Sequence, residues 1–219
     1  MDLEVIAKIA AGEMAGNRSY AYKSLGDKYY HGQRVARLAL RLRQLLFPEM
    51  TDKDDVLTVA AWFHDICNSH DVPRKIHGEK GAALVRELIK DHCTATELDE
   101  ICNMITVHDD RAAKQSSVLL KLHQDADHLD HFGTNAVRRT INDAAKLDQP
   151  MREAMRETKE HFREAKDAIW RIEVHFDLSR RVYDEKMAFF FEFAKRFETE
   201  MNGEIWNEAQ LLAGWDGSI

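Results

Sequence analysis

The stretch "VLTVAAWFHDIC", Val56 to Cys67, decides the fold class. It is apolar on nearly every face of a helix, which indicates a helix buried on all sides rather than an amphipathic surface helix. The run ends abruptly at His64-Asp65, and burying two such polar side chains costs free energy unless a partner satisfies them. We therefore expect the central helix of a bundle, with Thr51 or Asp52 as its N-cap. We also expect His64-Asp65, at the end of this helix, to bind a partner group.

The segments on either side show helical spacing. Before the central run, apolar residues recur every three or four positions from Val35 to Leu46, which predicts an amphipathic helix that ends before Pro48. After it, helices are expected over 78–92, 94–108 with Thr96 as N-cap, 116–133 and 134–147. One or two long charged helices follow over 151–201, and no convincing alternating strand is present. The sequence thus predicts an all-α helical bundle.

Length and composition favour one domain. A chain of 219 residues can bury a substantial core, and 44% hydrophobic with 32% charged residues is ordinary for a globular protein. We expect a single domain over residues 1–219, with a core over about 20–150 and C-terminal helices over about 151–205 packing on it. Gln149-Pro150 is the only plausible seam.

Charge and cysteine content narrow the partners and the location. A formal net charge of −7 argues against binding of duplex nucleic acid but leaves room for a small phosphorylated ligand. The three cysteines form no C-x-x-C pair, so structural zinc and disulfides are not expected. No run is long and apolar enough for a signal peptide or a membrane span, so we expect a cytoplasmic protein with no membrane partner. A homodimer through the C-terminal helices stays open, because the phenylalanines between Phe189 and Phe197 suit either core packing or a dimer face.

The histidines and aspartates carry the functional signal. Four segments begin or end a helix with a potential metal ligand, and these are His31, His64-Asp65, His108 and Asp125 or Asp127. A mixed set of imidazoles and carboxylates suits a divalent ion such as Mn, Fe, Co, Ni, Zn or Mg, with open positions for water and a phosphate oxygen. Such an ion lowers the pKa of its water and screens phosphate charge, as phosphoester hydrolysis requires.

The order His31, His64-Asp65, Asp127 resembles the HD-domain metal-dependent phosphohydrolase superfamily. Three segments carry the likeness, namely "YYHGQRVARLAL", "VAAWFHDI" and "LLKLHQDADHLDHFG", the last similar to the D-A-D-x-L-D-x-x-G segment of a soluble bacterial branch. The C-terminal "SRRVYDEKMAFFFEFAKRFETEMNGE" is similar to the closing helix of that branch. The resemblance implies a fold of packed helices in which His31, His64, Asp65 and Asp127 bind one metal ion.

The resemblance leaves other roles open. Asp125 competes with Asp127, although two residues apart on a helix they cannot face the same point. Asp130 shares the face of Asp127 and could orient a histidine from the second shell. A second ion is possible in this superfamily, and His77 and His108 would then bind it with Asp65 as a bridge.

Water activation and phosphate binding are less defined by the sequence. Asn68 stands where some members have a glutamate that acts on the attacking water, so Asp71, His77 and His108 remain the candidates for that role. The candidate phosphate-binding cations are Arg34, Lys80, Lys121 and Arg138. The remaining histidines are expected to be surface or satisfied core residues, namely His70, His92, His123, His128, His131, His161 and His175.

Two functions follow from these observations. The first is a metal-dependent phosphohydrolase of a small phosphorylated metabolite, most plausibly a nucleotide, acting as a nucleoside triphosphate pyrophosphohydrolase or a nucleotidase. The alternative is a non-catalytic helical sensor that binds a metal or nucleotide and a partner protein.

Overall fold

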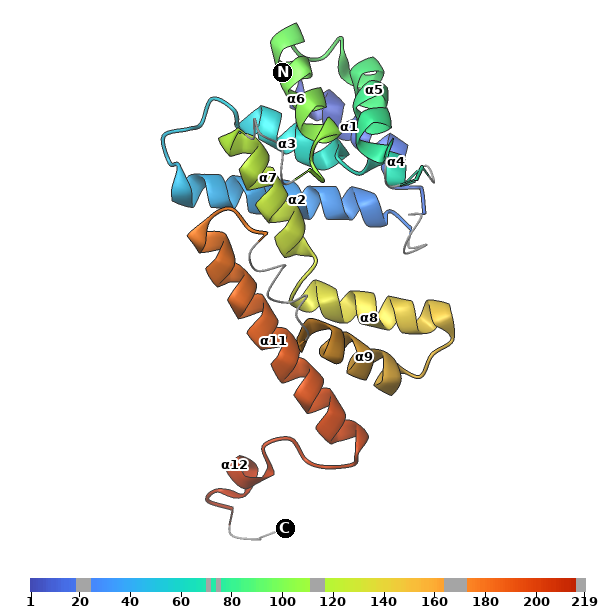
Figure 1. Ribbon diagram of the computed structural model, residues 1–219, viewed down its shortest axis with the longest axis vertical. Coiled ribbons are helices and arrows are strands. Elements are labelled where there is room, and N and C mark those ends of the chain that lie inside the picture. The colour runs from blue at the N-terminus through green and yellow to red at the C-terminus, as the bar shows by residue number, and fades with distance from the viewer. Residues whose placement is uncertain (19–24, 70–71, 74–75, 111–116, 164–172, 216–219) are drawn as a thin grey trace. The chain divides into compact units, whose positions relative to one another are not determined.

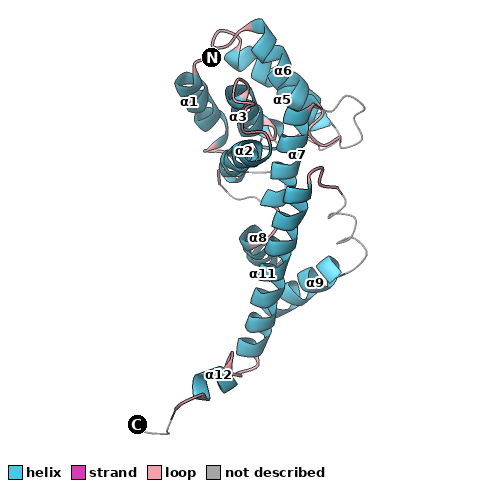
Figure 2. Ribbon diagram, turned by 90° about the vertical axis from the view of Figure 1, so that its left-hand side faces the viewer, coloured by secondary structure: helices cyan, strands magenta, loops and turns pink. Residues whose placement is uncertain are grey.

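The computed structural model describes residues 1–18, 25–69, 72–73, 76–110, 117–163 and 173–215. These residues form helices, and among them the sole β-type pairing is an isolated bridge between Arg18 and Leu25 (Figures 1 and 2). The predicted all-α fold is therefore confirmed. In the described parts of the chain, no helix combines the length and the apolar character that crossing a membrane would require.

The chain divides into two compact units. The first contains residues 1–131 and 170–183, and the second contains residues 132–169 and 184–219. The boundary thus falls at His131-Phe132 and not at the expected seam, Gln149-Pro150, because the helices on either side of Pro150 pack against each other. That the two units act as one domain stays a prediction.

The first unit is a bundle built around one long helix, α2. Its helices are α1 (Leu3–Met14), α2 (Asp27–Leu46), α3 (Asp54–Phe63), α4 (Ile66–Ser69), α5 (His77–Ile89), α6 (Ala95–Thr106) and α7 (Val118–Asp130). Helix α2 packs against α3 and α7, while α6 packs against α3 and α5 (Figure 1). As predicted, α2 ends before Pro48, with Phe47 as its C-cap.

Helix α3 is the buried centre that the apolar run predicts. Its apolar side chains from Val56 to Phe63 are almost all fully buried. The expected N-cap is wrong, because the helix begins at Asp54 after Lys53 and receives no side-chain cap. The run breaks at its polar doublet: His64 is the C-cap of α3, Asp65 lies between the helices, and α4 starts at Ile66. The polar doublet therefore lies at the junction of α3 and α4.

Hydrogen-bonding side chains begin α6 and α7. Thr94, and not the expected Thr96, is the N-cap of α6, since it forms a capping box with Glu97. Ser117 accepts a hydrogen bond from the backbone N–H of Leu120 at the start of α7. These caps fix the helices that bring the later functional residues to the bundle.

Two glycines allow close helix contacts. A Cβ atom at Gly32 of α2 would lie 2.6 Å from the carbonyl oxygen of Trp62 in α3, and one at Gly78 of α5 would lie 2.5 Å from that of Thr106 in α6. Each glycine directly follows a histidine, His31 or His77. The missing side chains thus bring both histidines close to the neighbouring helix.

The second unit contains the remaining helices. They are α8 (Thr134–Leu147), α9 (Met151–Arg163), the larger part of α11 (Asp177–Met201) and α12 (Glu208–Leu212). Its core includes Phe162, whose ring lies 5.9 Å from that of Phe132 and 4.8 Å from that of Phe190. In the phenylalanine run, Phe190 is fully buried whereas Phe189 is exposed, so part of the run is core.

Candidate metal centre

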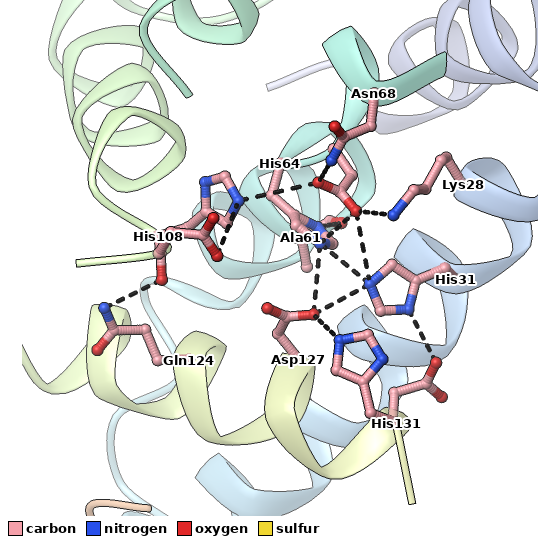
Figure 3. A network of polar contacts seen from close by, with 12 residues as sticks. Lys28, His31, Ala61, His64, Asn68, His108, Gln124, Asp127 and His131 are labelled. Atoms are coloured by element: carbon pink, nitrogen blue, oxygen red, sulfur yellow. Dashed lines mark hydrogen bonds and ion pairs between the residues drawn. The ribbon is translucent and has the colours of Figure 1, made fainter. Parts of the chain in front are cut away.

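A first cluster of ligand atoms forms where α2, the end of α3 and α7 meet (Figure 3). His31 Nε2 lies 3.2 Å from His64 Nε2, and Asp127 Oδ1 lies 3.0 and 3.6 Å from these two nitrogens. Asp65 Oδ2 lies 4.0 Å from His31 Nε2 and 3.8 Å from His64 Nε2. The structure therefore gathers around one point the four residues that the sequence pattern selects.

A second cluster lies on the other side of Asp65. His77 Nε2 is 2.9 Å from His108 Nε2, and both nitrogens face Asp65 Oδ1 at 3.5 and 3.9 Å. Asp109 adds a carboxylate 3.7 Å from His77 Nε2 and 3.8 Å from His108 Nε2. Except for Asp109, these side chains are buried. The two oxygens of Asp65 thus face two different pairs of imidazoles.

Hydrogen bonds to the far side of each ring fix which nitrogen faces the clusters. His64 Nδ1 donates to the carbonyl oxygen of Ala61 at 2.8 Å, and His108 Nδ1 donates to that of Ile105 at 2.6 Å. A carbonyl oxygen only accepts, so the proton of each neutral ring is on Nδ1 and the electron pair of Nε2 points inward. Electron pairs of ring nitrogens that face each other repel unless a cation lies between them. The rings of His64 and His108 are therefore oriented as metal-binding histidines are.

The ring of His31 is oriented by the carboxylate of Asp130. His31 Nδ1 donates to Asp130 Oδ2 at 2.8 Å, and Arg34 holds the same carboxylate through two hydrogen bonds, of 2.9 Å from Nε and 2.8 Å from Nη2. A carboxylate behind a metal-binding histidine fixes the ring and raises its basicity. Asp130 therefore lies where a second-shell residue would lie, three positions after Asp127 on α7.

The electrostatics of the first cluster favour positive charge. Burial opposes protonation of His31, but hydrogen bonds to Asp127 and Asp130 outweigh it and raise the pKa of His31 to about 9. Burial would also raise the pKa of Asp65 and Asp127. The charges of Lys28 and the nearby histidines nevertheless hold the pKa of Asp65 well below its usual range, and hydrogen bonds with His31 and His64 do the same for the pKa of Asp127. Both carboxylates thus stay ionised in a buried site, which a bound cation would neutralise further.

The spacing of the donor atoms fits divalent ions. Ligand atoms about 2.0–2.2 Å from an ion lie about 3–4 Å from one another. The donor separations in both clusters fall near this range. Among the described residues, three groups of three ligand atoms lie within 4.8 Å of one another, and these are His31, His64, Asp65; Asp65, His77, His108; and His31, Asp127, His131. The residues present therefore suit two ions that share Asp65, with nitrogen and oxygen ligands and no thiolate.

Sequence reasoning missed several residues at this site. The ammonium of Lys28 donates to Asp65 Oδ2, the amide of Asn68 donates to Asp65 Oδ1, and Asp109 lies beside the second cluster. His131 stacks on His31 with ring centroids 5.4 Å apart. A signal was available for Lys28, which precedes His31 by three positions and so shares its helix face.

His123 is the most unusual of the missed residues. The sequence predicted a surface or satisfied core residue, yet the ring is 1% exposed and, among the described residues, neither of its nitrogens has a hydrogen-bond partner. Its ring centroid lies 5.0 Å from that of His64 and 6.2 Å from that of His108. It precedes Asp127 by four positions, which places both on one face of α7.

Other candidates from the sequence lie apart from the clusters. Asp125 accepts hydrogen bonds from the backbone N–H groups of His175 at 2.8 Å and Phe176 at 3.1 Å. Lys80 is exposed, Lys121 is half-buried, and Arg138 belongs to the second unit, where it bonds Asn135. Asp71 and His70 lie outside the described residues.

Comparison with known proteins agrees with this geometry. The HD domain family model matches residues 29–131, so the match ends at the boundary of the first unit. None of the curated proteins matches the chain.

Several solved structures share the fold. Bacillus subtilis YpgQ is 20% identical, with a TM-score of 0.64 over 92% of this chain and 98% of that chain. It has also been crystallised in complex with ADP, in a structure that is 19% identical over 91% of this chain and 96% of that chain, with a TM-score of 0.62. An HD-superfamily hydrolase from Bacillus thuringiensis is 19% identical, with a TM-score of 0.62 over 93% of this chain and 100% of that chain.

At these identities the likeness establishes the fold. The chain therefore shares the fold of these solved structures, one of which is an HD-superfamily hydrolase, and the HD domain model matches its residues 29–131.

Proposed function

We propose that the protein is a metal-dependent phosphohydrolase that acts on a small phosphorylated metabolite. In this proposal His31, His64, Asp65 and Asp127 hold one divalent ion, and Asp65, His77 and His108 hold a second. The observation that carries the proposal is the position of Asp65, whose Oδ1 faces His77 Nε2 at 3.5 Å while its Oδ2 faces His64 Nε2 at 3.8 Å. A carboxylate between two pairs of imidazoles is a bridging ligand in two-metal sites.

The chemistry divides between the ions and the chain. When bound, divalent ions lower the pKa of a coordinated water and screen the charge of a phosphate. The chain holds Asp65 in place from both sides, through Lys28 on Oδ2 and Asn68 on Oδ1. Asp109, whose side chain is 39% exposed beside the second cluster, could accept the proton of an attacking water.

The proposed substrate class is a nucleotide. The complex of the structurally similar YpgQ with ADP supports this choice, since the two chains share a fold over most of their length. Within the class we propose release of pyrophosphate from a nucleoside triphosphate first, and hydrolysis of a monophosphate second. Action in the cytoplasm and assembly as a homodimer stay predictions.

The proposal is tested by metal analysis followed by assays of release. The purified protein should contain about two divalent ions per chain. It should release phosphate or pyrophosphate from some members of a nucleotide panel when Mn²⁺, Co²⁺ or Mg²⁺ is supplied. Full activity in a His64→Ala variant would refute the metal site.

A non-catalytic sensor is the second candidate. Asn68 favours it, because an amide that donates to Asp65 cannot take a proton from water as a glutamate would. The sensor would bind metal and nucleotide with measurable affinity but release no phosphate from any member of the panel, whereas the enzyme would do both.

A further inference from the structure

We propose that Lys28 anchors a phosphate oxygen of the substrate beside the metal centre. This inference rests on the proposed function, since it requires that Asp65 is a metal ligand and that the substrate carries a phosphate. It assigns the phosphate contact to a residue other than the four cations that the sequence suggested.

Lys28 is held inside the site by helix α2. Its side chain and that of Asp65 are both 10% exposed, and its ammonium donates to the carboxylate oxygen that faces His31 and His64 (Figure 3). Lys28 and His31 are three positions apart, so one face of α2 carries both the cation and the proposed ligand. A lysine this buried requires a partner, and Asp65 is that partner.

The ammonium of Lys28 can donate more hydrogen bonds than the one that it donates to Asp65. A lysine carries three N–H groups, and among the described residues the hydrogen-bond acceptor of Lys28 is Asp65. Two N–H groups therefore remain for an anion next to the first cluster. A compact ammonium on a flexible stem suits a phosphate oxygen, as in other phosphate sites that use lysine as a point charge.

The other candidate cations are less suited to this contact. Arg34 already makes two hydrogen bonds to Asp130, behind the ring of His31. Lys80 is exposed on α5, so water screens its charge. Lys28 thus combines burial, unused donors and direct contact with a proposed ligand.

The test is binding of inorganic phosphate to the Mn²⁺-loaded protein, measured by calorimetry together with metal content. Lys28→Met keeps the length of the stem but removes the charge, and it should weaken phosphate binding by about 10- to 100-fold at unchanged metal content. Lys28→Arg should retain most of the affinity. The matched control Lys8→Met removes a lysine that is 72% exposed on α1 and should bind phosphate like the wild type.

Folding is controlled separately, because Lys28→Met leaves Asp65 without its counter-charge in the metal-free protein. Lys28→Gln can still donate to Asp65 but carries no charge, so it should lose phosphate affinity while keeping its helical circular dichroism. Wild-type phosphate affinity in Lys28→Gln at equal metal content would overturn the assignment. Loss of metal from both uncharged variants would also overturn it, since Lys28 would then act only by positioning Asp65. A wild-type protein that retains no metal would overturn the proposed function itself.

Discussion

Gly32 lies so close to Trp62 that an added Cβ atom would be 2.6 Å from the Trp62 carbonyl oxygen. The contact joins α2 to the last turn of α3, immediately beside His31 and His64. We expect Gly32→Ala to lower the free energy of unfolding by about 1–3 kcal/mol, since backbone and not a movable side chain fills the space. Metal content should fall as well, because His31 would shift away from His64.

The control for that variant is Gly12→Ala in α1, where a Cβ atom would meet nothing within 4 Å. Alanine inside a helix is favoured over glycine by about 0.5–1 kcal/mol, so Gly12→Ala should be slightly stabilising. Equal effects of the two substitutions in thermal unfolding would show that the close contact at Gly32 has no energetic weight.

The sharing of Asp65 predicts the metal content of three variants. His64→Ala and His77→Ala should each retain about one ion, because each removes a ligand of one cluster, while Asp65→Ala should retain almost none. Elemental analysis of the purified proteins measures this. Equal losses in His64→Ala and Asp65→Ala, with no loss in His77→Ala, would leave a mononuclear centre.

Alanine variants of Asp125 and Asp127 should differ in their effects, one on stability and the other on metal binding. Asp127→Ala should lose metal with little loss of stability, since its carboxylate faces His31 and His64. Asp125→Ala should retain metal but unfold more easily, by about 1–3 kcal/mol, because it leaves two partly buried backbone N–H groups without their acceptor. The opposite pattern in metal analysis and thermal unfolding would exchange the two roles.

Asp130 should act on metal affinity through the ring of His31. Asp130→Asn keeps the size of the side chain but weakens its hold on His31 Nδ1, so metal affinity should fall by about 10- to 100-fold. The control is Asp99→Asn, which removes an exposed carboxylate paired with Arg86. Competition with a chelating dye measures both, and unchanged affinity in Asp130→Asn would exclude an orienting role.

The role of His123 should follow from whether its replacement raises or lowers the unfolding temperature. Its two unpartnered ring nitrogens are buried at a cost of about 1–3 kcal/mol, which His123→Leu would remove. We therefore expect the variant to unfold at a higher temperature and to keep its metal. A less stable variant, or one with less metal, would show that the ring binds something at the centre.

The sequence by itself determined the helical fold and the residues of the first cluster. An apolar run from Val56 to Phe63 is favoured in a buried core, so the central position of α3 followed from hydrophobicity. The resemblance of the order His31, His64-Asp65 and Asp127 to the HD superfamily selected the side chains that meet there, with Asp125 as the competitor of Asp127. Helix limits were less well predicted, because α3 begins at Asp54 without a side-chain cap and Thr94, not Thr96, forms the capping box of α6.

Only the tertiary structure decided that the two clusters share Asp65. The resemblance left a bridging Asp65 open, and the spacing between Asp65 and His77 could not decide it. Whether both oxygens of the carboxylate face imidazoles depends on how closely α5 approaches α6 at Gly78. Neither could the sequence tell that Asp125 serves backbone groups of a segment 50 residues away, or that Lys28 is buried against Asp65. Hydrogen bonds and ion pairs between distant helices depend on distances of a few tenths of an ångström, which packing sets and local sequence does not.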